Sequence, residues 1–388
     1  MSLGKGLLTA GILVCTTVLA RAGGPYLINA QQADFRSRPE YVRDHLAHIE
    51  SLPFDGVVFT STTTAVLMNG TARSYEEIAQ EFAPLHGLSF TRIKHNLAWV
   101  NVDRPADFFG DWTVTIENFR ILARVLRENG IAGIFFDNEE YLRRLFNYPD
   151  NCDDATKSLA QYRAQARLRG REIGEALANE FPEIVLMVLH GPYSSFAGTP
   201  EEVHRGQTEW DTEELRGPFS IGLLEGLDSR AEFVDGGAVY AYRAAADFQV
   251  SYDYRKFELA SDGSDCPFIS PELRHVWPRK VGIAFGVYNH SFAGVPMDAT
   301  IMRTTLAAAL QRCDEFVWLY SEGINWNAPG EIAPEWVDAV LAAKGPQAFV
   351  SITSPGTGGT FVNPASISIK ATASRAGGEI SKVEFFDG

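Results

Sequence analysis

The sequence predicts a (β/α)8 barrel, an α/β fold, followed by the opening strands of a β-sandwich. From Pro25 onward, short apolar runs alternate with helical stretches, which is the pattern of a parallel α/β fold. Eight such strands over roughly 320 residues match the size of a (β/α)8 barrel. After Gly345-Pro346 the pattern changes to period-two alternation between turn residues, which is typical of antiparallel β-structure.

The elements of the predicted barrel are bounded by recognisable start and stop signals. Asn129-Gly130 ends one helix, and Pro334 begins another. A doubly wound open sheet is the alternative, but the turn after the first strand lacks a Gly-x-Gly-x-x-Gly sequence. The predicted strands are Tyr26–Ala30, Gly56–Thr60, Ile93–Val100, Gly133–Phe136, Ile184–Leu189, Ala238–Tyr242, Val281–Tyr288 and Phe316–Tyr320. The predicted helices are Pro39–Ser51, Val114–Asn129, Lys157–Phe181, Thr212–Leu227, Ala299–Arg312 and Pro334–Lys344.

Residues 1–22 have the pattern of a signal peptide. Lys5 provides a positive start, Leu7–Ala20 is apolar, and Ala20-Arg21-Ala22 is a small-x-small cleavage signal. A buried N-terminal helix is the alternative interpretation. We therefore expect a secreted protein, extracellular or periplasmic, and no membrane insertion, because no other segment approaches transmembrane length.

The charge of the chain restricts its partners. The net charge is −15, and removal of the signal peptide would take away only positive residues. Such a surface repels phosphate backbones and anionic lipid, which argues against nucleic-acid and membrane partners. The sequence also lacks a phosphate-binding loop, a dinucleotide fingerprint and a Gly-x-Ser-x-Gly turn, so no cofactor is expected.

The C-terminal segment, residues 347–388, contains several short alternating runs. These runs resemble the start of the bacterial Ig-like modules that are appended to secreted polysaccharide-active enzymes. A complete sandwich needs roughly 80–100 residues, so the resemblance implies a partial Ig-like domain and leaves 23–346 as the barrel. The runs are Phe349–Pro355, Thr360–Pro364, Ile367–Ala373 and Ile380–Gly388.

The most informative residues for chemistry follow the fourth predicted strand. Asp137 and Glu139 share one face of the extended chain, because side chains alternate along a strand. In barrel enzymes the chemistry lies at these strand ends. Two close carboxylates cannot both ionise freely, so one of them should hold a proton near neutral pH, as a general acid requires. The alternative is that these acids cap the following helix.

These residues resemble the motifs of two groups of glycoside hydrolases. The Asp137-x-Glu139 pair is similar to the end of the fourth strand in chitinase-type hydrolases, in which the glutamate is the acid and the aspartate assists. The two earlier aspartates of that family fall on Ala132 and Phe135. Asn138-Glu139 also resembles the Asn-Glu motif of the largest retaining clan, although no glutamate follows the seventh strand here. The resemblance therefore implies the (β/α)8-barrel glycoside hydrolase superfamily.

A second candidate carboxylate, Glu322, follows the eighth predicted strand among aromatic residues. Strands four and eight face each other across an eight-stranded barrel. Carboxylates placed in this way more easily reach the roughly 6.5–9.5 Å separation of an inverting pair than the roughly 5 Å of a retaining pair. An inverting mechanism is therefore our hypothesis.

Other strand ends carry side chains suited to sugar recognition, because aromatic faces stack on rings while amides and imidazoles bind hydroxyls. The histidines among them would also permit a metal-dependent hydrolase, but Asn29-Ala-Gln31 replaces the His-x-His pair of amidohydrolase-type barrels, and we expect no metal. The candidate substrate-binding residues are His95, Asn96, His190, Tyr193, Tyr242, Asn289, His290, Trp318, Tyr320 and Trp326.

Together these features predict a secreted glycosidase that acts on a polysaccharide or oligosaccharide. Glu139 would be the general acid, Asp137 its partner, and Glu322 the base or nucleophile. If a substrate acetamido group took part, Asp137 would orient it and Glu322 would matter less. The alternatives are a non-catalytic carbohydrate-binding scaffold and the metal-dependent hydrolase.

Overall fold

The computed structural model describes residues 25–139, 145–149, 152–192, 215–264, 266 and 268–345, and the two strands 348–354 and 370–375. Residues Pro25–Gly345 form one compact unit. The predicted signal peptide lies outside the described residues. The strands of the C-terminal segment are described below by themselves.

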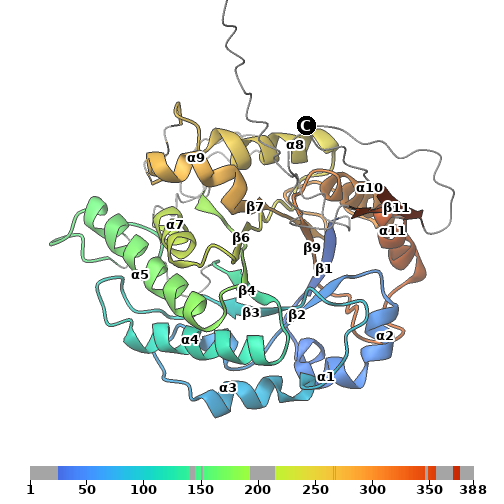
Figure 1. Ribbon diagram of the computed structural model, residues 1–388, viewed down its shortest axis with the longest axis horizontal. Helices are drawn as coiled ribbons and strands as arrows, with labels where there is room; N and C mark the ends of the chain where they lie inside the picture. The colour runs from blue at the N-terminus through green and yellow to red at the C-terminus, as the bar shows by residue number, and fades with distance from the viewer. Residues whose placement is uncertain are drawn as a thin grey trace, which may run out of the picture. The chain divides into compact units, whose positions relative to one another are not determined.

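The centre of the unit is a parallel sheet in the order β7-β6-β5-β4-β3-β2-β1-β9-β8. Only Ala284 separates β7 from β8, and its N–H donates to Asp235 O at 2.8 Å, while Gly286 N donates to Gly237 O at 2.7 Å. The two pieces therefore act as one interrupted strand that closes an eight-stranded barrel (Figure 1). The strands are β1 (Tyr26–Gln31), β2 (Gly56–Phe59), β3 (Leu97–Asn101), β4 (Gly133–Asp137), β5 (Val185–Val188), β6 (Glu232–Asp235), β7 (Val281–Ile283), β8 (Phe285–Tyr288) and β9 (Phe316–Ser321).

Helices surround these strands, as Figure 1 shows. Serine side chains begin two of them through capping boxes, Ser74 with Glu77 and Ser158 with Gln161. The predicted helix over residues 39–51 is divided in two at His45. The helices are α1 (Pro39–Asp44), α2 (Leu46–Ser51), α3 (Tyr75–Phe82), α4 (Thr113–Glu128), α5 (Leu159–Glu180), α7 (Arg216–Gly226), α8 (Ala245–Asp253), α9 (Pro271–Lys280), α10 (Ala299–Leu310) and α11 (Pro334–Lys344).

Helices α5 and α7 pack at unusually short range through glycines. A Cβ on Gly170 would lie 2.1 Å from Phe219 O, and a Cβ on Gly222 would lie 2.0 Å from Arg167 O. Only glycine permits this backbone approach. The contact fixes the position of α7, whose first residue is the buried Arg216.

The prediction for the sixth strand was wrong, because β6 ends at Asp235 and precedes the segment that the sequence favoured. The chain turns after β6 at Gly237, which has a φ of +55°, and the Arg255 guanidinium occupies the space where a Cβ would be. Arg255 pairs with the buried Asp235 at 2.6 Å. The polar ends of β6 weaken its hydropathy signal, whereas the apolar residues after it cover the core as an irregular loop.

The inside of the barrel is filled by every second residue of the strands. Trp318 lies at its centre, fully buried, and its Nε1–H donates to Gly236 O at 2.8 Å. A Cβ on Gly286 would lie 2.2 Å from the Trp318 ring, so the glycine makes room for the indole. The buried inward residues are Ile28, Ala30, Val58, Leu97, Trp99, Phe135, Met187, Leu189, Val234, Ala238, Ala284, Phe316 and Trp318.

The C-terminal segment contributes two antiparallel strands, β10 (Ala348–Ser354) and β11 (Lys370–Arg375). Ala348 pairs with Arg375, and the register shifts between Ile352 and Ser354. Both strands overlap the runs whose period-two pattern predicted antiparallel β-structure, β10 with Phe349–Pro355 and β11 with Ile367–Ala373.

Candidate active site

The mouth of the barrel, where the carboxyl ends of the strands lie, contains the Asp137–Glu139 pair. Asp137 is the last residue of β4 and follows the inward Phe135 by two positions, so it also points into the barrel. Its Oδ1 accepts a 3.1 Å hydrogen bond from Glu139 N, and its Oδ2 accepts a 3.2 Å hydrogen bond from Trp99 Nε1. Both carboxyl oxygens of Asp137 are therefore held.

The surroundings of Asp137 raise its pKa to about 7. Burial is the main cause, and the charge of Glu139 adds to it. The hydrogen bonds from Glu139 N and Trp99, together with the charge of Arg216, act in the opposite direction. Asp137 is thus the carboxyl of the pair that carries a proton for part of the time at neutral pH.

Glu139 makes its own contact with His190, which follows β5. The distance between Glu139 Oε1 and His190 Nε2 is 2.8 Å. Asn138 holds the histidine in place, because its amide donates to His190 O at 2.7 Å and accepts from His190 N at 2.9 Å. The side chain of Glu139 is 32% exposed, whereas residue Asp137 is only 3% exposed. Of the two carboxyls, Glu139 is therefore the one that a substrate can reach.

The second carboxylate, Glu322, lies directly after β9 and is bound by two phenols. Tyr288 donates to its Oε2 at 2.7 Å, and Tyr320 donates to its Oε1 at 3.1 Å. Burial and the negative charge of Glu322 raise the pKa of Tyr288 to about 12 and raise that of Tyr320 as well. Both phenols therefore keep their protons and act as donors.

The backbone of Glu322 is held in the same way as that of His190. The Asn289 amide donates to Glu322 O at 2.9 Å and accepts from Glu322 N at 3.0 Å. His290 Nε2 also lies 2.8 Å from Glu322 O. An asparagine after one strand thus fixes the candidate site residue that follows the next strand, once at β4–β5 and once at β8–β9.

Aromatic rings connect the two carboxylate clusters. The centroid of Trp99, which binds Asp137, lies 6.2 Å from that of Tyr320, which binds Glu322. Tyr320 stacks on Tyr288 at 5.6 Å, and Tyr240 lies 5.0 Å from Tyr288. The mouth therefore has an aromatic floor with carboxylates on two sides of it.

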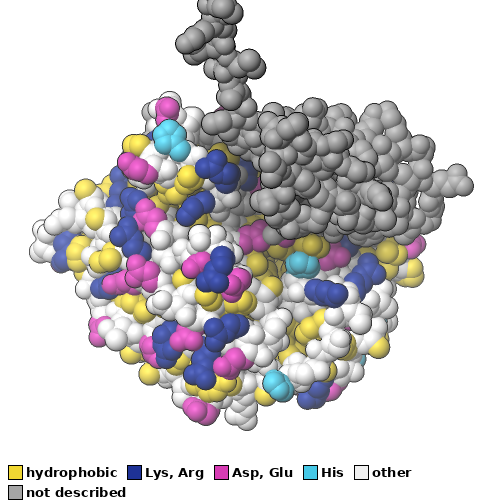
Figure 2. Space-filling view, viewed as in Figure 1, with side chains coloured by type: hydrophobic (Ala, Val, Ile, Leu, Met, Phe, Trp, Pro, Cys, Tyr) yellow, Lys and Arg dark blue, Asp and Glu magenta, His cyan; other side chains and the backbone are white. Residues whose placement is uncertain are grey.

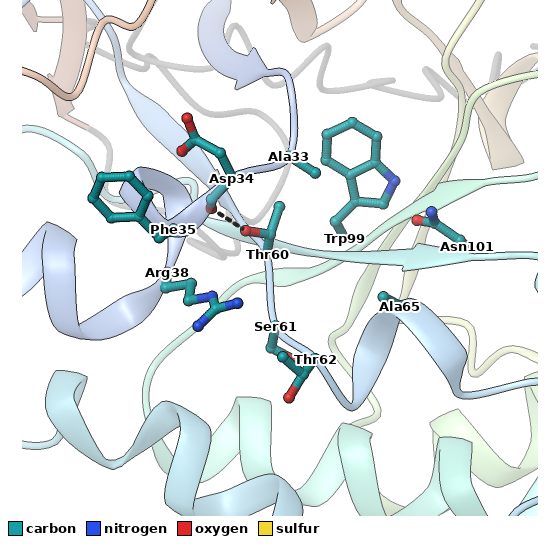
Figure 3. A pocket seen from close by; sticks show the side chains of 10 residues that line it. All are labelled: Ala33, Asp34, Phe35, Arg38, Thr60, Ser61, Thr62, Ala65, Trp99 and Asn101. Atoms are coloured by element: carbon teal, nitrogen blue, oxygen red, sulfur yellow. Dashed lines mark hydrogen bonds between the residues drawn. The ribbon is translucent and has the colours of Figure 1, made fainter.

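A pocket of about 220 Å³ opens beside this floor (Figure 3). It lies at the carboxyl ends of β1, β2 and β3, and Trp99 belongs both to its wall and to the Asp137 contacts. Asn101, which also lines it, is paired with Asp137 in the β3–β4 register. The lining residues are Ala33, Asp34, Phe35, Arg38, Thr60, Ser61, Thr62, Ala65, Trp99 and Asn101.

Several predicted substrate-binding residues lie away from the mouth. His95 and Asn96 come directly before β3, at its opposite end, where the His95 ring stacks on Tyr26 at 3.5 Å and the Asn96 amide binds Val57 N and Ile93 O. Trp318 is enclosed in the barrel centre.

Two more of these residues belong to the core outside the barrel. Trp326 packs on Phe54, and its Nε1–H donates to Ser321 Oγ at 2.9 Å. Tyr242 is 2% exposed and packs on Phe248. Tyr193 lies outside the described residues. The structure therefore brings together at the mouth His190, Asn289, His290 and Tyr320 with the three carboxylates.

Sequence reasoning did not single out Trp99 or Arg216. The alternation of side chains along β3 could have identified Trp99. It lies two residues before Asn101, and Asn101 is paired with Asp137 on the neighbouring strand. Arg216 carries no such signal, because its position depends on the packing of α7.

Three observations concern the charges, the helices and the potential metal ligands of the described residues. On the face in Figure 2, Lys and Arg side chains lie among Asp and Glu side chains without a large area of one sign. Within the described part of the chain, no helix has the length and apolar character to cross a membrane. Among the same residues, no group of three or more His, Cys, Asp and Glu side chains could hold a metal ion.

Comparisons with solved structures find barrels of distant sequence. A β-mannanase from the blue mussel Mytilus edulis is 12% identical, with a TM-score of 0.44 over 82% of this chain and 92% of that one. A broad-specificity endoglucanase from Bacteroides salanitronis is 13% identical, with a TM-score of 0.41 over 81% and 86%. A dihydropteroate synthase from Xanthomonas albilineans is 14% identical, with a TM-score of 0.35 over 83% and 92%. At these sequence identities and TM-scores, the similarity to these structures does not bear on the chemistry of the site.

The C-terminal segment has a more specific match. Residues 349–388 match the family described as Bacterial Ig domain. A search of the curated proteins finds no match to the chain. The resemblance of the C-terminal segment to bacterial Ig-like modules, which the sequence predicted, is thus confirmed.

Proposed function

We propose that the chain is a secreted glycoside hydrolase that cleaves glycosidic bonds of a polysaccharide or oligosaccharide. The observation that carries the proposal is the Asp137–Glu139 pair, in which a buried carboxyl with a pKa of about 7 lies beside a reachable one. Cleavage of a glycosidic bond by carboxyl groups needs an acid that retains a proton near neutral pH. The pair meets this requirement at the end of the barrel where such sites are built.

In this proposal, Glu139 donates the proton to the leaving-group oxygen. Because the two carboxyls interact, their titration belongs to the pair, and a proton held by the pair can reside on Glu139 while Asp137 is ionised. His190 positions Glu139 through the 2.8 Å contact with Oε1. Asp137, once ionised, stabilises the positive charge that develops on the sugar ring.

Glu322 completes the reaction as the base or nucleophile. Either role needs a carboxylate held in a fixed position, and the hydrogen bonds from Tyr288 and Tyr320 hold both oxygens of Glu322. The aromatic floor between the clusters supplies apolar faces for the C–H surfaces of sugar rings. A neutral or cationic substrate fits the net charge of the chain, −15.

The proposal includes export and a modular organisation. Residues 1–22 would be removed as a signal peptide, 23–346 would form the catalytic barrel, and 347–388 would belong to an Ig-like module that holds the enzyme near its substrate. Mass spectrometry of the secreted protein should find an N-terminus at Gly23. Recovery of unprocessed protein inside the cell alone would contradict export.

The catalytic proposal is tested by reducing-end release from a panel of polysaccharides. We expect the wild type to release reducing ends from at least one member of the panel. The variants Glu139→Gln, Asp137→Asn and Glu322→Gln should be about 100-fold or more less active, because general acid–base catalysis typically contributes a factor of this size to the rate. Glu183→Gln is the control, because this exposed acid precedes β5 at the opposite end of the barrel.

The outcomes distinguish the alternatives. Near-normal activity of Glu322→Gln alone would remove the two-carboxylate mechanism and leave the substrate-assisted one. Binding without any reducing-end release by the wild type would overturn the hydrolase in favour of a carbohydrate-binding scaffold. NMR of the first product gives the anomer, and retention of configuration would contradict inversion.

A further inference from the structure

We infer that the pocket beside Trp99 is a binding site for one neutral sugar ring of the substrate, separate from the carboxylates that would break the bond. This inference rests on the proposed function for the identity of the ligand class. Three segments form the pocket: the loop after β1, the loop after β2 and the end of β3 (Figure 3). Its volume of about 220 Å³ is below the roughly 300–1,000 Å³ of sites for drug-sized ligands, and suits a single ring.

The hydroxyl groups of the pocket present acceptors. Thr60 Oγ1 donates its proton to Asp34 O at 3.2 Å, and Thr62 Oγ1 donates to Glu81. Ser61 Oγ donates to Thr64 Oγ1 at 3.0 Å and accepts from Thr64 N at 3.1 Å, which leaves it one lone pair. Because each of these protons is used inside the protein, the lone pairs that remain can accept hydrogen bonds from sugar hydroxyls.

The donors come from Arg38 and Asn101. In the part of the chain that the structure describes, neither side chain makes a hydrogen bond to another residue, and both line the pocket. Arg38 offers five N–H groups and Asn101 two, with one amide oxygen as an acceptor. A sugar ring, whose hydroxyls both donate and accept, matches this mixture of donors and acceptors.

An aromatic ring completes the site. Phe35 is 60% exposed, the largest exposed fraction among the large apolar side chains that the structure describes. In Figure 3 its ring and that of Trp99 lie on either side of the threonine and serine hydroxyls. Such a ring can stack on the C–H face of a sugar while the polar groups bind its edge.

The charges of the pocket favour a neutral ring. The Asp34 carboxylate is already bound by Arg36, whose backbone N–H donates to Oδ1 at 2.7 Å and whose guanidinium Nε–H donates to Oδ2 at 2.8 Å. Arg38 and Glu81 both line an adjoining smaller cavity of about 70 Å³, so the four charged side chains Asp34, Arg36, Arg38 and Glu81 carry two negative and two positive charges. No net positive charge is left to attract the carboxylate of an acidic sugar.

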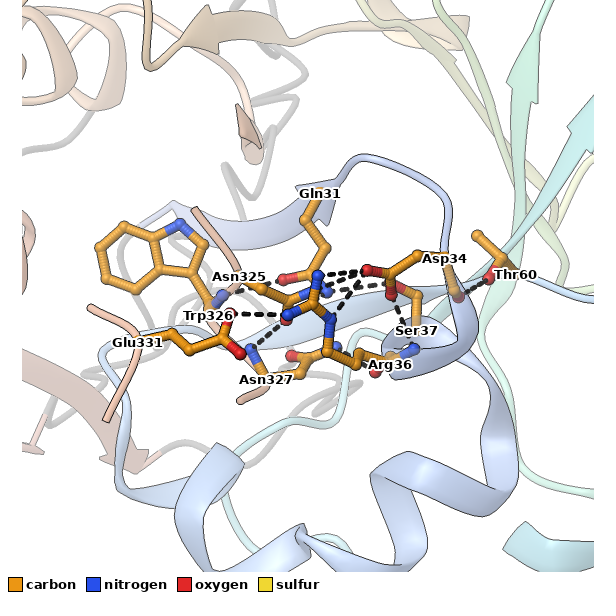
Figure 4. A network of polar contacts seen from close by, with 9 residues as sticks. All are labelled: Gln31, Asp34, Arg36, Ser37, Thr60, Asn325, Trp326, Asn327 and Glu331. Atoms are coloured by element: carbon orange, nitrogen blue, oxygen red, sulfur yellow. Dashed lines mark hydrogen bonds and ion pairs between the residues drawn. The ribbon is translucent and has the colours of Figure 1, made fainter. Parts of the chain in front are cut away.

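The loop that carries Phe35 and Arg38 is held in place before any ligand arrives. Figure 4 shows the network that joins it to the segment after β9. Asn325 donates to Asp34 Oδ2 at 3.2 Å, and Asn327 donates to Arg36 O at 2.9 Å. Such preorganisation lowers the entropy cost of binding.

The test is affinity electrophoresis of the full chain in gels that contain hydroxyethyl cellulose, glucomannan or polygalacturonate. We expect retardation by at least one neutral polymer and none by polygalacturonate. Phe35→Ala should weaken the binding roughly two- to tenfold, the range expected for a stacked aromatic contact. Asn101→Ala should also weaken it. Phe257→Ala is the matched control, because Phe257 is 50% exposed and contacts Tyr252 edge to face, as Phe35 contacts Tyr41.

The outcomes separate this inference from the hydrolase proposal. Binding that is weakened in Phe35→Ala but unchanged in Glu139→Gln supports the pocket whether or not any polymer is cleaved. Unchanged binding in both Phe35→Ala and Asn101→Ala, absence of retardation in every gel, or retardation by polygalacturonate alone would overturn it, even if the wild type releases reducing ends.

Discussion

The indole of Trp99 donates a 3.2 Å hydrogen bond to Asp137, and the same ring lines the neighbouring pocket. One side chain therefore belongs to both the proton-bearing pair and the proposed sugar site. A hydrogen bond to an ionised carboxylate favours ionisation, so Trp99 lowers the pKa of Asp137 while burial raises it.

Trp99→Phe removes this hydrogen bond and keeps an aromatic ring. The pKa of Asp137 should rise further above 7, by about one unit or less, because only one of several contributions is lost. The alkaline limb of the pH profile of kcat/KM should move upward by the same amount. Trp112→Phe serves as the control, since its Nε1–H binds Asp107 O away from the pair. An alkaline limb that stays in place would refute a role for Trp99 in this titration.

Asp137→Asn should change the pH dependence of stability. The folded-state pKa of Asp137 is about 7 and its ordinary value is 3.8, so the folded protein binds the proton more tightly than the unfolded chain. The wild type therefore loses stability as the pH rises from about 4 to about 7, by as much as about 4 kcal/mol for this group.

The Asp137→Asn variant does not lose stability with rising pH in this way, because asparagine does not titrate. The difference in free energy of unfolding between Asp137→Asn and wild type should thus move in favour of the variant as the pH rises, as measured by urea unfolding at pH 5 and pH 8. Asp44→Asn, a change at an exposed carboxylate, is the control. A difference independent of pH would show that Asp137 has an ordinary pKa.

Asn138→Ala should disturb the site through His190. The substitution removes the two hydrogen bonds that Asn138 makes with the backbone of His190, which costs about 1–3 kcal/mol of stability. Displacement of the imidazole from Glu139 should lower kcat by about tenfold or more. Asn289→Ala provides the comparison, because it acts on Glu322 in the same manner. If the Asn138→Ala variant is expressed normally and its kcat is unchanged, Asn138 has only a structural role and does not position His190 for the reaction.

Gly286→Ala should destabilise the barrel. The new Cβ would lie 2.2 Å from the Trp318 ring, so the indole must move in a packed interior, which costs about 1–3 kcal/mol. Gly282→Ala, in the same interrupted strand, has its nearest contact at 3.6 Å and should have a much smaller effect. Thermal unfolding of both variants compares them directly, and equal melting temperatures would contradict the packing argument.

The parts of the fold that the sequence predicts well are those in which local pattern and tertiary environment agree. β4 extends only one residue beyond its prediction, because its apolar run ends at Asp137, where the strand reaches the mouth. β6 is the opposite case. Its ends are Glu232 and Asp235, and the buried ion pair with Arg255 that permits this strand cannot be read from the local sequence.

The sequence predicts which candidate site residues share a face of one strand, but it does not predict their contacts with residues on neighbouring strands. The shared face of Asp137 and Glu139 follows from alternation, and the contact of Glu139 N with Asp137 agrees with it. The contacts with Trp99 and His190 depend on the register of neighbouring strands. Composition also cannot tell which aromatic residue enters the core, as with Trp326, and which reaches the mouth, as with Tyr320.

The network around Gln31 and Asn325 has a consequence for the order of folding. Gln31 belongs to the first strand and Asn325 follows the last, and their 2.8 Å hydrogen bond joins positions that are 294 residues apart. Contacts between such distant positions form late, because loop-closure entropy must be overcome first. During synthesis, the loop with Phe35 leaves the ribosome long before its support does. The network that supports the proposed sugar pocket is therefore complete only when the barrel closes.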